Sequence, residues 1–283
     1  MVILIMKLKK LNECVIASKI SKTGCFLGKN RDRSYTPNVE IIHGVYPKFE
    51  YVIIHDRDTG YMEGVNATSG FAILNSALLN SVDFGKNKSD EGKNIMLALL
   101  KCHTLEDILE SLLHKYPVYG NTMVATKDSI SILEATPEKN ALKHYDKAGD
   151  YVVRTNHGIL VPEVGYQPSN TEDYLSSMSR LAAGEVVMDN SDNIDEFLSG
   201  ISYPLYGKLS ILNPSRTSNY LNSTAQIGID MENKVFKFSN FPGLNNFKGI
   251  KRLGDESIKP IYKIVVEDVE PPISIPFLTW GLR

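Results

Sequence analysis

A single stretch, Cys14 to Asp32, decides the fold and reads CVIASKISKTGCFLGKNRD. Its two apolar runs flank the polar residues 21–24, which is the pattern of a β-hairpin. Paired strands lie about 4.8 Å apart, so an acidic residue just past the returning strand can reach groups near the start of the first strand. The hairpin is therefore expected to bring Asp32 towards Cys14.

Short apolar runs bounded by Gly, Asp and Asn predict more strands outside this hairpin. They are EYVIIHD (50–56), GFAILNS (70–76), NTMVATK (121–127), SISILEA (129–135), DYVVRTN (150–156) and the tail PIYKIVVEDVEPPISIPF (260–277), which also holds a Pro-rich coil. A late hairpin is predicted over 223–240, because two alternating runs flank the polar turn at 230–233. These strands are expected to form antiparallel sheets.

Helices are predicted in the middle of the chain. From Thr104, leucine and isoleucine recur at steps of three and four, acidic residues fill the first turn, and Pro117 ends the pattern. A second helix is expected over 170–185, capped by Asn170 or Thr171. Strands first, helices next and strands again predict one α+β domain, in which helices cover antiparallel sheets.

Composition argues against several kinds of partner. The chain has 283 residues, with 31 Lys and Arg against 33 Asp and Glu and no block of like charge, so a nucleic-acid partner is not indicated. No run approaches the roughly 20 apolar residues of a membrane helix, so a membrane is not expected either. The cysteines Cys14, Cys25 and Cys102 form no disulfide framework and lack a second ligand at metal-site spacing. We therefore expect a reduced, cytoplasmic protein without a metal site.

Several motifs follow one another in an order that resembles a known family. After Cys14 come Gly28, Asn30 and Asp32, in the pattern Gly-x-Asn-x-Asp. Further along are GVNATSGFAILNSAL (64–78), RTNHG (154–158), SSMSR (176–180) and the hairpin around Asp230. Together they resemble the N-terminal-nucleophile (Ntn) hydrolases, in the linear-amide branch that includes penicillin acyltransferases and choloylglycine (bile salt) hydrolases.

The resemblance implies a four-layer αββα sandwich with two stacked antiparallel sheets. It also implies a leader, residues 1–13, that is removed on maturation, and a single catalytic domain over residues 14–283. Two departures stand out: Lys29 occupies a position where bile salt enzymes carry Arg, and most relatives of that subgroup remove only the initiator Met. The pattern therefore lies nearer the acyltransferases, which cut their own precursors.

The chemistry explains why the leader has to go. A thiol attacks an amide carbonyl effectively only as the thiolate, and an ordinary Cys has a pKa of about 8.5, so a base must take its proton. An α-amino group, with a pKa of about 7.7 to 8, is suitable when it belongs to the nucleophile itself. Autocatalytic cleavage between Glu13 and Cys14 would expose this amine. We therefore expect an amidohydrolase or acyltransferase that cleaves a linear non-peptide C–N amide bond through a Cys14 thioester.

The resemblance also implies roles for other residues. Asp32 is expected to hold the new amine by a charge-assisted hydrogen bond, and Asn75 to donate an N–H to the oxyanion. Asn156 is expected to position the amine or the substrate amide, and Arg180 to fix the surroundings of the nucleophile. The expected partner is a small-molecule amide, and no metal or organic cofactor is implied. The oligomeric state stays open, a homo-oligomer included.

Two alternatives stay open at this point. One is a Cys–His hydrolase that uses Cys14 or Cys25 with His157. The other is a non-catalytic module that keeps the fold. By default a Cys in a strand is a small buried hydrophobe, and we expect this of Cys25 and Cys102. The acyl group of the substrate is not encoded in the motifs.

Overall fold

The computed structural model describes residues 12–33, 35, 37–46, 49–78, 88–202, 222–240, 250–253, 261–265 and 273–276. The strands are β1 (Asn12–Ser21), β2 (Gly24–Arg33), β3 (Val39–Tyr46), β4 (Phe49–Asp56), β5 (Tyr61–Asn66), β6 (Phe71–Ser76), β7 (Gly120–Ala125), β8 (Ile130–Ala135), β9 (Asn140–Tyr145), β10 (Tyr151–Arg154), β11 (Asn222–Asp230), β12 (Val235–Asn240), β13 (Ile250–Leu253), β14 (Ile261–Val265) and β15 (Ile273–Pro276). The helices are α1 (Lys88–Lys101), α2 (Leu105–Glu110), the π-helix η1 (Ser111–Lys115), α3 (Thr171–Asp189) and α4 (Ile194–Ser202).

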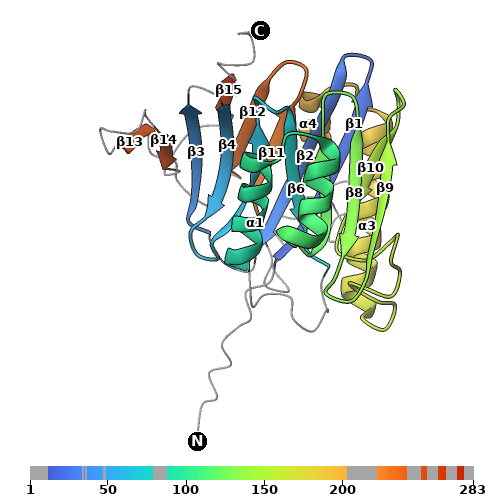
Figure 1. Cartoon of the computed structure of the whole chain (residues 1–283). Helices are drawn as coiled ribbons and strands as arrows, with labels where there is room; N and C mark the ends of the chain where they lie inside the picture. Colours follow the sequence, from blue (N-terminus) through green and yellow to red (C-terminus); the bar gives the residue numbers. More distant parts are fainter. Residues whose placement is uncertain are drawn as a thin grey trace, which may run out of the picture.

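These strands form two antiparallel sheets. The first has the order β10-β1-β2-β11-β12-β15, and the second has the order β13-β14-β3-β4-β5-β6-β7-β8-β9. The sheets stack face to face, with α1 over the outer side of the second sheet and α3 and α4 over the outer side of the first (Figure 1). The chain is therefore a four-layer αββα sandwich, which confirms the predicted α+β fold class.

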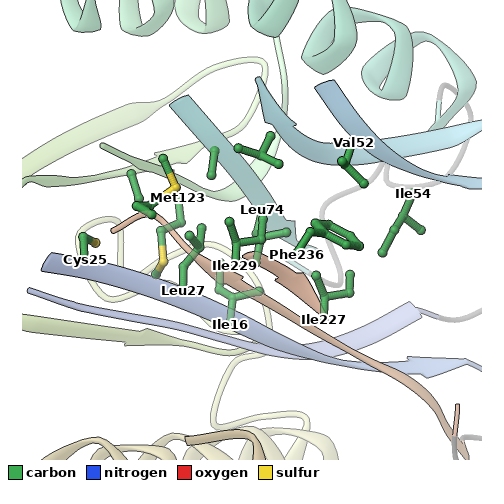
Figure 2. Packing of buried hydrophobic residues seen from close by; sticks show 14 of the residues in the cluster. Ile16, Cys25, Leu27, Val52, Ile54, Leu74, Met123, Ile227, Ile229 and Phe236 are labelled. Carbon is green, nitrogen blue, oxygen red and sulfur yellow. The ribbon is translucent and has the colours of Figure 1, made fainter. Parts of the chain in front are cut away.

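Three apolar layers hold the sandwich together. The first lies between the sheets and includes Ile16, Leu27, Leu74 and Ile227 (Figure 2). The second joins the second sheet to α1, α2 and η1, and the third joins the first sheet to α3 and α4. Since β1 and β2 lie between two of these layers, both faces of the hairpin are buried.

The predicted hairpin forms as expected. Strands β1 and β2 pair from Asn12 opposite Arg33 to Ser21 opposite Gly24. Gly24 has a φ of 117°, in the region that favours glycine, which explains the turn residue at the start of β2. Successive side chains of a strand point to opposite faces. Ile16 and Ile20 thus lie between the sheets, and the side chains that alternate with them face the helices.

A pair of glycines sets how closely α4 approaches the first sheet. Gly28 on β2 lies opposite Gly228 on β11. A Cβ atom on Gly28 would lie 2.6 Å from Cε1 of Phe197, and one on Gly228 would lie 2.7 Å from Cδ1 of Leu198. The helix therefore rests on a patch of bare backbone.

Several elements were not predicted from the sequence. Helices α1 and α4 and strands β3, β5, β9 and β13 are additional to the expected set. The helix predicted after Thr104 forms, with Oγ1 of Thr104 accepting from the N–H of Asp107, but it continues as the π-helix η1 rather than as one α-helix. Helix α3 begins at Thr171 after Asn170, and the hairpin of β11 and β12 matches its predicted range.

The ends of the chain are only partly described. Residues 1–11 lie outside the described residues, as does part of the predicted tail. The division into a leader over 1–13 and a catalytic domain over 14–283 stays a prediction. Among the described residues, no helix combines the length and the apolar character needed to cross a membrane.

Candidate active site

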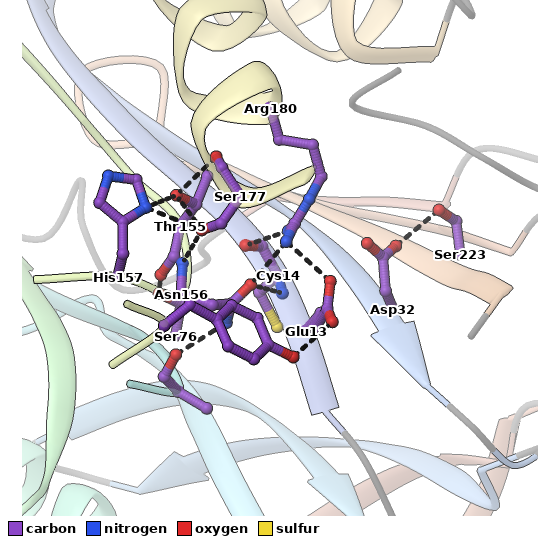
Figure 3. A network of polar contacts seen from close by, with 12 residues as sticks. Glu13, Cys14, Asp32, Ser76, Thr155, Asn156, His157, Ser177, Arg180 and Ser223 are labelled. Carbon is purple, nitrogen blue, oxygen red and sulfur yellow. Dashed lines mark hydrogen bonds and ion pairs between the residues drawn. The ribbon is translucent and has the colours of Figure 1, made fainter. Parts of the chain in front are cut away.

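Cys14 lies near the start of β1 with its thiol on the face between the sheets. The residue is only 2% exposed. Its backbone N–H donates to Oδ1 of Asn156 at 3.3 Å, and its carbonyl oxygen accepts from Nη1 of Arg180 at 3.0 Å. Nη1 of Arg33 lies 3.4 Å from the sulfur (the network around Cys14 is shown in Figure 3). Asn156, Arg180 and Cys14 therefore meet at one place, as the motif order led us to expect.

Glu13, the residue before Cys14, is part of the same network. Its carboxylate accepts from Nη2 of Arg180 and from the hydroxyl of Tyr166, each at 2.7 Å. Its carbonyl oxygen accepts from Nη1 of Arg33 at 3.4 Å. Arg33 Nη1 is thus within reach of both the carbonyl oxygen before Cys14 and the thiol sulfur of Cys14.

Three cationic side chains lie in a row along β2, near the thiol of Cys14. Lys29, Arg31 and Arg33 are alternate residues, so their side chains share the inner face with Leu27. Their counter-charges come from the second sheet. Nζ of Lys29 lies 2.8 and 2.7 Å from the two carboxylate oxygens of Glu63. Asp56 Oδ2 lies 3.5 Å from Nη2 of Arg31 and 3.9 Å from Nε of Arg33.

The ion pairs explain how these charges remain inside the protein. Burial alone would raise the pKa of Glu63, but the neighbouring Lys29 and Arg31 hold the pKa below its ordinary value. Likewise, burial opposes ionisation of Asp56, and Arg31 with Arg33 keeps its pKa low. Burial lowers the pKa of Lys29, although the Cys14 sulfur and Glu63 act in the other direction. The result is a buried zone where negative charge is stabilised beside a thiol.

Arg31 is the least satisfied member of this zone. Among the described residues, none of its guanidinium nitrogens has a hydrogen-bond partner. Its closest counter-charges are Asp56, at 3.5 Å, and Glu63, at 3.7 Å. Arg31 lies directly opposite Cys14 in the strand register, so its positive charge also acts on the thiol side of β1.

Asp32 is not the residue paired with Cys14 in the hairpin but lies one position further along β2. In the register it is opposite Glu13, and its Oδ1 accepts from the hydroxyl of Ser223 at 2.6 Å. Figure 3 shows this pair on the β2 side of Glu13. The expected contact between Asp32 and an α-amine concerns the cleaved chain and stays a prediction.

Asn75 lies on β6, and its side-chain amide is already engaged. Nδ2 donates to the carbonyl oxygen of Tyr119 at 3.1 Å and to Oγ1 of Thr122 at 2.8 Å. Its own carbonyl oxygen accepts from Nζ of Lys29 at 2.5 Å, which links it to the cations beneath Cys14. An oxyanion would have to replace one of these acceptors, so the expected role of Asn75 remains untested.

Asn156 is the centre of the network. Its Oδ1 accepts from Arg180 Nη2 at 3.0 Å as well as from Cys14, and its Nδ2 donates to the carbonyl oxygen of Ala77 at 2.7 Å. Its backbone N–H donates to Oγ of Ser177 at 3.0 Å. Both ends of the amide are therefore fixed, and Oδ1 is held as an acceptor directed at the nitrogen of Cys14.

A carboxylate from the second sheet shapes the loop that follows Asn156. Oε2 of Glu134 accepts from the backbone N–H groups of Ile159, Leu160 and Val161, at 2.8, 2.7 and 3.0 Å. Oε1 accepts from Nε of Arg154 at 2.7 Å. Buried backbone donors need partners, and this single carboxylate supplies three of them.

The alternative with a catalytic histidine finds no support in the geometry. Nδ1 of His157 lies 2.8 Å from Oγ of Ser177 and 3.2 Å from Oγ1 of Thr155, and no hydrogen bond joins it to a cysteine in the described part of the chain. Burial, and secondarily Arg180, lowers the pKa of His157, which favours the neutral form of the ring. His157 therefore helps to position the segment around Asn156.

Cys25 and Cys102 have the surroundings of structural residues. The sulfur of Cys25 lies 3.3 Å from Oγ of Ser18 within the apolar layer between the sheets, and burial raises its pKa to about 12. The sulfur of Cys102 lies 3.3 Å from Oγ of Ser111. Neither thiol has a cation beside it among these contacts.

The sequence motifs did not nominate Arg33 and Tyr166, which both contact the Glu13–Cys14 segment. Only one of the two could have been predicted from a local sequence pattern. Arg33 continues the alternation of Lys29 and Arg31 along a strand, which places all three on one face. Tyr166 lies in the loop before α3 and reaches Glu13 only through the tertiary fold. Among the described residues, no group of three or more His, Cys, Asp or Glu could hold a metal ion.

Comparison with known proteins finds similarity in the fold but not in the sequence. No protein-family model and no curated protein sequence matches the chain. A variant of conjugated bile acid hydrolase from Clostridium perfringens has a TM-score of 0.52 at 13% identity, over 94% of this chain and 97% of that chain. A second variant of that hydrolase has a TM-score of 0.49 at 13% identity, with the same coverage. Penicillin V acylase from Agrobacterium tumefaciens also has a TM-score of 0.49 at 13% identity, over 80% of this chain and 82% of that chain. The match at a TM-score of 0.52 confirms the expected sandwich fold.

Proposed function

We propose that this protein is an amide hydrolase of the Ntn type whose nucleophile is Cys14, and that it becomes active by cutting its own chain between Glu13 and Cys14. The observation that carries the proposal is the position of Arg33. Its Nη1 lies 3.4 Å from the Glu13 carbonyl oxygen and 3.4 Å from the Cys14 sulfur. One cation can therefore stabilise both the attacking thiolate and the oxyanion that forms on the attacked carbonyl.

The self-cleavage proceeds in two steps. The sulfur of Cys14 attacks the Glu13 carbonyl carbon, the C–S bond forms, the C–N bond breaks, and the nitrogen of Cys14 takes the proton from the thiol. Water then adds to the thioester, which releases Glu13 as a free carboxylic acid and restores the thiol. The products are the leader, residues 1–13, and a chain whose first residue is Cys14.

The network around Cys14 suits the mature enzyme as well. The new α-amine would lie where the peptide N–H now donates to Asn156 Oδ1 at 3.3 Å. With a pKa of about 7.7 to 8, this amine can take the proton of the thiol as the sulfur attacks a substrate. Asp32 would bind the amine in its charged form, and Asn75 would exchange an acceptor for the substrate oxyanion.

The fold supports this chemistry, because it is shared with a hydrolase of conjugated bile acids. The proposed reaction is cleavage of a linear non-peptide C–N amide bond, or transfer of the acyl group from the Cys14 thioester to another amine. It needs no metal or organic cofactor, and the proposed partner is a small-molecule amide. Cys14 is 2% exposed in the uncleaved chain, so the proposal requires that cleavage make the thiol accessible to substrate.

Intact-mass spectrometry and N-terminal sequencing of the purified protein test the proposal. Wild-type protein and the Cys25→Ala variant should both begin at Cys14. The Cys14→Ala variant should keep Met1 or its immediate neighbour as the first residue and should lose amidase activity. An active enzyme that retains residues 1–13 would contradict the proposal and would reopen the Cys–His alternative.

A further inference from the structure

The side chain of Glu13 occupies a built carboxylate site. Oε2 accepts from Nη2 of Arg180 and Oε1 accepts from the hydroxyl of Tyr166, each at 2.7 Å. The exposed fractions of Glu13, Arg180 and Tyr166 are 1%, 1% and 4%. Each carboxylate oxygen thus has its own donor, and both donors are shielded from water.

The self-cleavage thioester shows where an acyl group lies. In that intermediate Glu13 is the acyl group on the Cys14 sulfur, and in the enzymatic reaction the acyl group of the substrate is bonded to the same sulfur. The two thioesters are then hydrolysed by the same attack of water. The position of the Glu13 side chain therefore indicates where an acyl chain bonded to the sulfur of Cys14 would lie.

Resting on the proposed function, we propose that the site vacated by Glu13 binds the acyl group of the substrate. The preferred substrates are amides whose acyl group carries a carboxylate at the position of the Glu13 side chain. From the carbonyl carbon outward, that side chain has the carbon skeleton of a glutaryl group. The substrate class is accordingly the glutaryl-like monoamides of dicarboxylic acids.

The charge of Arg180 explains why an anionic acyl group fits better than a neutral one. Without Glu13, its hydrogen bonds in this network go to neutral oxygens, the carbonyl of Cys14 and Oδ1 of Asn156, both at 3.0 Å. A buried guanidinium that loses its carboxylate is destabilised. Asp32, opposite Glu13 in the register, already coexists with a carboxylate at this site.

Tyr166 adds a donor that stays protonated. Burial, followed by the charge of Glu13, raises the pKa of Tyr166 well above its ordinary value. The hydroxyl therefore donates to a carboxylate throughout the working pH range. It belongs to no step of the bond-breaking chemistry, so it can be changed to examine acyl selectivity.

The test compares two chromogenic amides with mature enzyme. These are glutaryl-p-nitroanilide and its neutral isostere 4-carbamoylbutanoyl-p-nitroanilide. The enzyme should prefer the acid in kcat/KM by about 10- to 100-fold, the range expected for hydrogen bonds between charged groups. The Tyr166→Phe variant should lower this ratio by about tenfold. Tyr145→Phe, on β9 with its ring beside Lys143, is the matched control and should keep the ratio.

The outcomes separate this inference from the proposed function. An equal or lower kcat/KM for the acid overturns the inference, as does cleavage of neither anilide by a chain that begins at Cys14. A protein that never loses its leader contradicts the proposed function instead. Because the wild-type ratio is informative without any variant, a poorly folded Tyr166→Phe protein leaves the test intact.

Discussion

Cys14 and Cys25 lie on one hairpin and face the same space between the sheets, yet their surroundings differ. Cys25 is 0% exposed and packs in the apolar layer, where burial raises its pKa to about 12. Cys14 is 2% exposed, and the guanidinium of Arg33 lies 3.4 Å from its sulfur. Burial alone therefore does not distinguish the two thiols. The charge next to the sulfur does, and one hairpin supplies both environments.

The stability of the protein should depend far more on the buried ion pairs of the β2 cations than on ion pairs at the surface. In the Lys29→Met variant, Glu63 would lose the partner that lies 2.7 Å away, and a buried carboxylate left without its partner typically costs about 3–5 kcal/mol. Chemical denaturation of the folded variant should show a loss of this size. The control is Lys93→Met, because Lys93 forms an exposed pair with Asp90 and should change stability by less than about 0.5 kcal/mol.

A small loss for Lys29→Met, similar to that of Lys93→Met, would show that Arg31 alone can compensate Glu63. The contrast between the two ends of the hairpin would then rest on the arginines.

Alkylation should separate the two thiols directly. With a pKa of about 12, Cys25 is deprotonated in roughly one molecule in 10,000 at pH 8, so iodoacetamide should modify it about a thousandfold more slowly than an ordinary exposed thiol. Its labelling should rise with pH up to about pH 12. Peptide mapping after timed labelling of the folded, cleaved protein should find Cys14 modified first. Comparable labelling of Cys25 at pH 8 would remove the distinction.

Replacing Arg33 should slow self-cleavage. The Arg33→Met variant removes the donor shared by the Glu13 carbonyl and the Cys14 sulfur, and loss of one oxyanion donor typically costs about 100- to 1,000-fold in rate. The measurement is the rate at which the leader is lost from freshly synthesised protein, followed by mass spectrometry. Arg33→Lys should recover part of the rate because it keeps the charge.

Arg57→Met is the matched control for Arg33. Arg57 pairs with Glu40 from a side chain that is 51% exposed. Thermal melting of each variant shows whether folding survives. Unchanged cleavage in well-folded Arg33→Met protein would mean that another group stabilises the oxyanion.

Much of the fold could be predicted from the sequence, because local patterns specify it. The polar turn at 21–24 and the apolar runs on either side predict the hairpin, while its exact register is known only from the structure. Strand β9 was missed because its residues are mostly exposed and lack an apolar face. The continuation of α2 as η1 was missed because a single π turn of five residues is too short to change the apolar spacing of the segment.

The candidate site was predictable only in part. The motifs nominated Cys14, Asn156 and Arg180, and the structure brings these three together. The cations of β2 could be placed on one face from the sequence, but charged residues on a strand usually face solvent. Their carboxylate partners, Glu63 and Asp56, come from the other sheet, and no local pattern specifies how two sheets align.

The glycines at 28 and 228 allow α4 to pack closely against the strand that carries the cations. The side chains of Phe197 and Leu198 pack against these two glycines, and the carbonyl oxygen of Ile201 on α4 accepts from Nδ2 of Asn30 at 3.1 Å. The contacts with β2 fall on the two residues next to Lys29, so α4 supports the backbone that carries the cations. The alignment of the cations along β2 thus depends on a helix outside the sheet, and on the lack of a side chain at positions 28 and 228.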